Sequence, residues 1–129
     1  MQSRTGKIII PSDTNVWPHE METAHALARS GLTVKFIRCS KERHVTSADV
    51  IIDGDEWEMK APESCKLKMV ERNLRRALKQ SPNVIFDSRR MKGIPDTAIE
   101  RELRKWALEL KSLRRLILVN RHGKVIAIK

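Results

Sequence analysis

The spacing of apolar residues along the chain divides it into predicted helices, strands and polar connections. Apolar residues that recur every three or four positions predict helices, and apolar residues at every second position predict strands. Helices are predicted at residues 19–30, 67–80 and 97–111. Strands are predicted at residues 32–37, 48–52, 56–60, 83–87, 116–120 and 124–128. Residues 7–10 are predicted to form either a further short strand or a docked arm.

The order of these segments indicates the fold class. One helix, three strands, a second helix and a fourth strand precede a third helix and a closing pair of strands. This mixture predicts an α/β domain, and 129 residues are enough for one hydrophobic core. We therefore expect a single domain over residues 1–129, with a flexible start at residues 1–6.

The strands at residues 48–60 read as a hairpin. Asp53-Gly54 is a strong two-residue turn signal, because glycine accepts a positive φ at no steric cost. The return strand alternates, so that Trp57 and Met59 share one face and the charged residues between and after them share the other. The turn and the alternation together predict a hairpin with one apolar and one charged face.

The charged face of this hairpin carries candidate catalytic groups. Glu58 and Lys60 lie side by side on it, and Asp49 on the first strand can point toward them. Two carboxylates can hold a divalent metal, with the carbonyl of Met59 as a further ligand. A lysine beside them can orient a water or stabilise charge that develops during phosphodiester hydrolysis. The alternative is a solvent-facing hairpin with ordinary alternating charges.

This hairpin resembles that of the PD-(D/E)xK nuclease superfamily, with Ala48 where the motif has its proline. The matching stretches also include residues 19–24, 77–83 and 123–126, so the resemblance covers most of the chain. The chain looks most similar to the nuclease domains at the C-termini of contact-dependent growth inhibition toxins, several of which cleave tRNA.

The resemblance implies both a fold and an activity. The fold would be a restriction-endonuclease-like α-β-β-β-α-β core with an added helix and a C-terminal β-hairpin. The activity would be hydrolysis of RNA, with tRNA as the favoured substrate on this resemblance, with Asp49 and Glu58 as ligands of Mg²⁺ (or Mn²⁺ or Zn²⁺) and Lys60 as a catalytic residue. An immunity protein would be a further partner.

A glutamate on the first helix is the next candidate, because members of this superfamily carry one that faces the metal. Glu20 shares a face with Ala24 and Leu27, whereas Glu22 lies on a more exposed face. Glu20 is therefore the preferred catalytic candidate. The alternative is that both acids favour the helix N-terminus through the helix macrodipole.

The charge balance indicates a polyanionic partner. The chain holds 26 Lys and Arg against 16 Asp and Glu, a net charge of +10. Nucleic acid fits this excess because cations displace counterions from phosphates. A solvated basic surface, or association with ribosomes or membranes, would also fit. The candidate phosphate-binding residues are Arg72, Arg75, Arg76, Lys79, Arg89 and Arg90.

The aromatic residues argue against a common class of nucleic-acid binder. Trp17, Trp57 and Trp106 are the only tryptophans, and the chain has no tyrosine. There is thus no predicted platform on which successive bases would stack, as in RRM or OB-fold proteins. The histidines have no partner that their spacing identifies.

The sequence also bears on where the protein is located. No apolar run reaches transmembrane length and no signal peptide is visible, so we expect a cytoplasmic protein without membrane contact. The cysteines, Cys39 and Cys65, have no zinc spacing and are expected to be free thiols.

Two rival functions remain open. They are a DNA endonuclease of the same fold and a nucleic-acid-binding module without catalysis.

Overall fold

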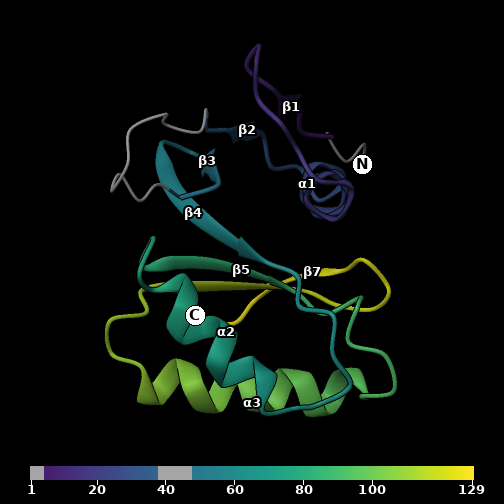
Figure 1. Ribbon diagram of the computed structural model, residues 1–129, viewed down its shortest axis with the longest axis vertical. Helices are drawn as coiled ribbons and strands as arrows, with labels where there is room; N and C mark the ends of the chain where they lie inside the picture. Colours follow the sequence, from purple (N-terminus) through teal and green to yellow (C-terminus); the bar gives the residue numbers. More distant parts are fainter. Residues whose placement is uncertain (1–4, 38–47) are drawn as a thin grey trace.

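The computed structural model describes residues 5–37 and 48–129 (Figure 1). The helices in this part of the chain are α1 (Pro18–Arg29), α2 (Met69–Ala77) and α3 (Asp96–Glu109). The strands are β1 (Ile8–Ile9), β2 (Val34–Phe36), β3 (Val50–Ile52), β4 (Asp55–Lys60), β5 (Asn83–Asp87), β6 (Arg115–Val119) and β7 (Val125–Ala127). None of these helices is long and apolar enough to cross a membrane.

The seven described strands form one mixed, curled sheet in which they lie in sequence order. β2, β3 and β4 form an antiparallel meander, and β4, β5 and β6 run parallel. The short β1 adds in parallel to β2, and β7 adds antiparallel to β6. The parallel strands therefore end together at one edge of the sheet.

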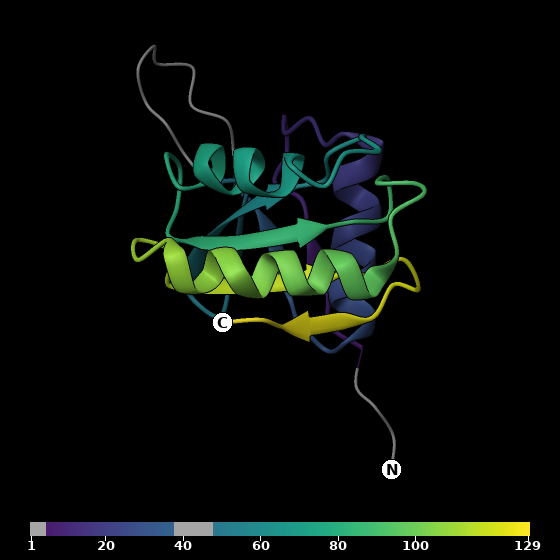
Figure 2. The same cartoon turned by 90° about the horizontal axis from the view of Figure 1, so that it is seen from below.

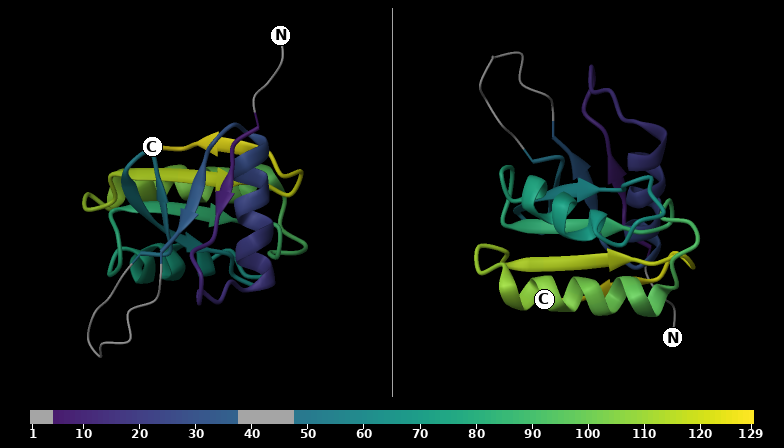
Figure 3. Two further views of the ribbon diagram at one scale, coloured as in Figure 1. Left: turned by 90° about the horizontal axis from the view of Figure 1, so that it is seen from above. Right: turned by 60° about the horizontal axis from the view of Figure 1, so that its bottom comes forward.

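Helices cover both faces of the sheet. α2 and α3 each connect two adjacent parallel strands in the same direction along the sheet, and such right-handed crossovers lie on one face. Figure 2 shows these two helices in front of the sheet. α1 covers the other face, where Ala24 and Leu27 pack with Trp57, Met59 and Ile85 (Figure 3).

β5 is the centre of the molecule, and all five of its residues are buried. Val84 and Phe86 belong to the apolar core against α2 and α3, whereas Ile85 belongs to the core against α1. The middle of a strand that is covered on both faces is apolar, which explains the Val-Ile-Phe run between Asn83 and Asp87.

The α/β class and the order of the predicted elements agree with the structure. The hairpin turn is also as predicted, since Asp53 and Gly54 have φ values of 51° and 82°. Residues 7–10 do contain a strand, which is β1. α2 is shorter than predicted, because it ends at Ala77 and residues 78–80 form turns.

Gly6, within the predicted flexible start at residues 1–6, makes a close backbone contact with α1 and the residues that follow it. Its N–H donates a hydrogen bond of 2.7 Å to the carbonyl of Ala28. A Cβ at this position would lie 1.9 Å from the carbonyl oxygen of Leu32, so only glycine fits this close approach. Residues 1–4, and residues 38–47 between the strands predicted at 32–37 and 48–52, lie outside the described residues.

Candidate metal and catalytic site

The register of the β3–β4 hairpin brings Asp49 and Glu58 together. Val50 pairs with Trp57 in the last pair of the β3–β4 ladder, and Asp49 directly precedes Val50. The charge of Asp49 acts on Glu58, so the two carboxyl groups lie close together. The N–H of Asp49 donates to the carbonyl of Trp57 at 3.0 Å, and its Oδ2 accepts from the N–H of Met59 at 2.9 Å. The Asp49 side chain thus contacts the backbone of β4 next to Glu58.

Glu58 and Lys60 lie on the face of the sheet that α2 covers. Glu58 pairs with Val84 and Lys60 with Phe86, and both apolar partners belong to the core against α2 and α3. Neighbouring residues on paired strands point to the same face. The predicted separation of the apolar and charged faces of the hairpin is therefore present in the structure.

Glu58 is buried, with only 6% of its surface exposed. Burial and the neighbouring Asp49 together raise the pKa of Glu58 to about 8, although Lys60 acts in the opposite direction. Lys60 Nζ lies 3.4 Å from Glu58 Oε2. Without a cation, this carboxyl group is largely protonated at neutral pH.

The residues present fit a hard divalent cation. Glu58 Oε1 is buried and has no hydrogen-bond partner among the described residues. A cation between Asp49 and Glu58 would satisfy that oxygen and remove the repulsion between the two carboxylates. Residues 5–37 and 48–129 contain no cluster of three His, Cys, Asp or Glu side chains that could hold a metal. Mg²⁺ suits such a sparse site because it keeps several waters and uses one or two carboxylates.

Glu20 lies near this site but also has a structural role. Its Oε1 accepts a hydrogen bond of 2.9 Å from the N–H of Trp17, the residue that caps α1. It lines a pocket that Asp49 also lines. Glu22 is exposed, and its charge is among the causes that raise the pKa of Arg89. Of these two acids, Glu20 lines the pocket that Asp49 lines, and Glu22 is not among its lining residues.

Four of the predicted phosphate-binding residues lie together on α2 and its C-terminal turn. Arg72, Arg75, Arg76 and Lys79 line one hollow of about 740 Å³, together with Lys68 and Glu71. Arg75 also pairs with Glu71, with Nε 2.8 Å from Oε2, but the other cations on this surface outnumber the single acid. The hollow is therefore a basic surface on the helix that directly follows the candidate catalytic strand.

The other two predicted phosphate-binding residues are engaged within the protein. Arg89 pairs with Asp87, with Nη2 2.7 Å from Oδ2. Arg90 donates to the carbonyl of Ala61 at 2.9 Å and to Glu63 Oε2 at 2.8 Å. Both guanidinium groups would have to exchange these partners, or share them, to bind a phosphate.

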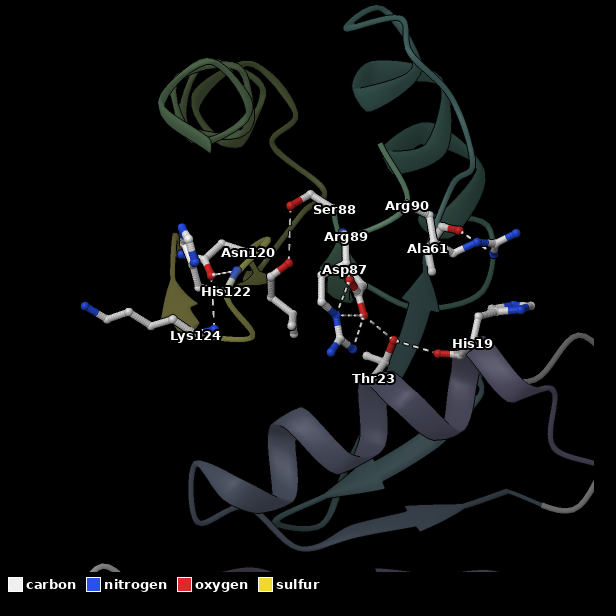
Figure 4. A network of polar contacts seen from close by, with 11 residues as sticks. His19, Thr23, Ala61, Asp87, Ser88, Arg89, Arg90, Asn120, His122 and Lys124 are labelled. Atoms are coloured by element: carbon white, nitrogen blue, oxygen red, sulfur yellow. Dashed lines mark hydrogen bonds and ion pairs between the residues drawn. The ribbon is translucent and has the colours of Figure 1, made fainter. Parts of the chain in front are cut away.

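The pattern along the chain did not reveal the polar network around Asp87 (Figure 4). Asp87 ends β5 and is 3% exposed, and its Oδ2 accepts a 2.6 Å hydrogen bond from Thr23 on α1. Arg89 binds the same carboxylate through its side chain and its N–H. An acid that directly follows the buried Val-Ile-Phe run was the available signal. This network fixes α1 to the edge where the parallel strands end.

The fold and the hairpin define the chain as a small α/β domain with two opposed carboxylates and a lysine on one hairpin. Comparison with known proteins then identifies its family. Residues 46–125 match the model of the contact-dependent growth inhibition CdiA C-terminal domain. The chain belongs to this family of toxin domains.

A solved structure has the same fold. It is a chain of the CdiA-CT/CdiI toxin and immunity complex from Burkholderia pseudomallei, with a TM-score of 0.74 and 18% sequence identity. The match covers 96% of this chain and 99% of the other. A search of curated proteins gave no match.

Proposed function

We propose that this toxin domain is a metal-dependent nuclease of the PD-(D/E)xK type that hydrolyses RNA, with tRNA as the preferred substrate. The observation that carries the proposal is the buried Glu58, with the Asp49 carboxylate close to it and Lys60 beside it. An ordinary solvent-facing hairpin does not bury a carboxyl group next to another one, because desolvation and repulsion both cost free energy.

Each residue of the hairpin has a distinct role in this proposal. Asp49 and Glu58 hold the cation, and the hydrogen bond from the Met59 N–H fixes the orientation of Asp49. A bound Mg²⁺ supplies a polarised phosphate oxygen and an activated water. Lys60, held beside Glu58, would orient the attacking water or donate a hydrogen bond to the phosphate oxygens as negative charge increases.

The substrate class rests on charge and on family membership. The net charge of +10 and the basic surface of α2 favour a polyanion. RNA is preferred because the chain resembles growth inhibition toxins that cleave tRNA. The Burkholderia structure of the same fold is a complex with an immunity protein, so we propose a protein inhibitor of this kind as a further partner.

The decisive experiment is to incubate the chain with total tRNA, with rRNA and with plasmid DNA, each with Mg²⁺, with Mn²⁺ or with EDTA. We expect cleavage of tRNA that requires metal and is abolished by Glu58→Gln. The matched control is Glu109→Gln, which removes an exposed carboxylate on α3 and should leave cleavage unchanged.

The other outcomes separate the rival functions. Cleavage of plasmid DNA with intact tRNA would identify a DNA endonuclease of the same fold. Binding of tRNA without cleavage under any metal condition would identify a binding module. Full cleavage in EDTA would refute the metal site and point to a metal-free ribonuclease.

A further inference from the structure

An exposed tryptophan shares a pocket with Asp49. Trp17 is 67% exposed, whereas Trp57 is 5% exposed and Trp106, on α3, is partly buried against the apolar core. Trp17 lines a pocket of about 180 Å³ that Asp49 and Glu20 also line. The indole and the first candidate metal ligand therefore border the same space.

The backbone of Trp17 is held in place. Its N–H donates to Glu20 Oε1 at 2.9 Å, and its carbonyl accepts from the N–H of Met21 at 3.0 Å. Pro18 follows, and its ring restricts the backbone at the start of α1. The ring of His19 lies nearly parallel to that of Trp17, with centroids 6.5 Å apart and an interplanar angle of 17°. The exposed ring is thus presented from a fixed position.

The polar groups of the pocket have capacity for a ligand. Thr14 Oγ1 is buried and has no hydrogen-bond partner in the described part of the chain, and it lines the pocket together with the exposed Asn15. A hydroxyl and an amide beside an aromatic face can bind the edge of a planar, polar ring. The pocket is smaller than the roughly 300–1,000 Å³ typical for drug-sized ligands, so it suits one ring system.

We propose that Trp17 stacks on one unpaired base of the substrate, and that Thr14 and Asn15 contact the edge of that base. This inference rests on the proposed function and deepens it, because it specifies a single-stranded nucleotide next to the phosphate that is cleaved. A base in a duplex is stacked and paired and cannot present its face to Trp17. The site therefore selects loops and single strands over continuous duplex.

The first test measures binding without catalysis. The full chain is titrated in EDTA with a short oligoadenylate and, separately, with the duplex that it forms with oligouridylate, and tryptophan fluorescence is recorded. We expect quenching by the single strand, little quenching by the duplex, and loss of the quenching in Trp17→Phe. Equal quenching by both nucleic acids, or quenching that persists in Trp17→Phe, would overturn the proposal.

The second test separates stacking from simple surface contact. Trp17→Ala should weaken binding of the single strand by roughly 5- to 150-fold, the range for loss of one base–aromatic stack, and Trp17→Phe should restore most of it. Leu108→Ala, at an 83% exposed apolar residue on α3, is the matched control and should bind as the unmodified chain does. Unchanged binding by Trp17→Ala, or an equal loss in Trp17→Ala and Trp17→Phe, would refute stacking.

These outcomes remain separate from the fate of the proposed function. If Glu58→Gln still cleaves tRNA, the metal site is refuted, but the quenching measured in EDTA still tests Trp17. If Glu58→Gln is inactive while every Trp17 variant cleaves and binds normally, the catalytic proposal stands and the stacking proposal fails. Thermal unfolding of each variant shows whether the fold is intact; we expect it to be, since the mutated ring is largely exposed.

Discussion

Among the single residues, Glu58 controls how the candidate site responds to pH. Its folded pKa of about 8 lies above the ordinary value of 4.5, because of burial and the neighbouring Asp49. The folded state therefore binds a proton more tightly than the unfolded state does. The stability linked to this group is fully present below about pH 4.5 and is lost as the pH rises through about 8.

The raised pKa of Glu58 predicts how the stability of the metal-free protein changes with pH. In EDTA, Glu58→Gln should match the unmodified chain near pH 4.5 and exceed its free energy of unfolding by roughly 2–5 kcal/mol above pH 8. The reason is that glutamine keeps the shape of the side chain but never acquires the buried charge. Urea denaturation at several pH values measures the difference. A constant difference across the pH range would contradict the raised pKa.

Binding of a metal ion should displace the proton that Glu58 holds in the metal-free protein. A cation held by Asp49 and Glu58 needs the deprotonated carboxylate, so Mg²⁺ binding near pH 7 should release up to about one proton from Glu58. Calorimetric titration in buffers with different ionisation enthalpies measures the number released. Affinity for Mg²⁺ should rise with pH up to about 8 and then level off. Binding without proton release would place the cation elsewhere.

At the scale of elements, the docking of α1 depends on a polar contact as well as on its apolar face. Thr23 donates to the buried Asp87 carboxylate, which also binds Arg89. Thr23→Val removes this donor and keeps the shape of the side chain. It should lower the free energy of unfolding by about 1.5–3 kcal/mol, the usual value for a hydrogen bond to a charged group.

A conservative variant controls this prediction. Thr23→Ser keeps the hydroxyl and should retain most of the stability, with only the loss of one buried methyl group. Urea denaturation of both variants at one pH gives the comparison. If Thr23→Ser and Thr23→Val lose the same amount, packing of the methyl group, and not the hydrogen bond, fixes α1.

The elements also show which features a single sequence can reveal. The hairpin was predictable, because the Asp53-Gly54 turn and the alternation on β4 are local signals that act over adjacent residues. The faces of Glu58 and Lys60 follow from that alternation. The predicted positions of the helices followed from their apolar spacing in the same way.

Other features depend on contacts between distant parts of the chain. Thr23 and Asp87 are separated by 64 residues, so no local pattern reports their hydrogen bond. The exposure of Trp17 was equally invisible, since an aromatic residue before a helix is ordinarily expected to pack. The absence of an aromatic platform was predicted for successive bases, whereas the structure presents one exposed indole.

At the scale of the whole molecule, the arrangement of layers places basic residues on one side of the candidate site. α2 follows β4 directly and covers the face of the sheet that carries Glu58 and Lys60. The cations of α2 line one hollow on this side. Arg89 and Arg90, in contrast, are tied to carboxylates and a carbonyl at the edge where the parallel strands end. We therefore expect the α2 surface to dominate the electrostatic part of substrate binding.

This expectation gives a prediction about salt. Replacing Arg72, Arg75 and Arg76 together with alanine should weaken binding to all nucleic-acid sequences alike. The slope of log K against log salt should flatten by up to about 0.9 per lost phosphate contact on duplex, or about 0.7 on single strands.

A matched variant replaces the exposed Arg101, Arg104 and Lys111 on α3 and just after it, and thus removes the same net charge. If contact with phosphates is responsible, only the α2 variant changes the slope. If both variants weaken binding equally, net charge alone is responsible. An α2 variant with normal affinity and slope would mean that this surface faces bulk solvent and that the substrate follows another path.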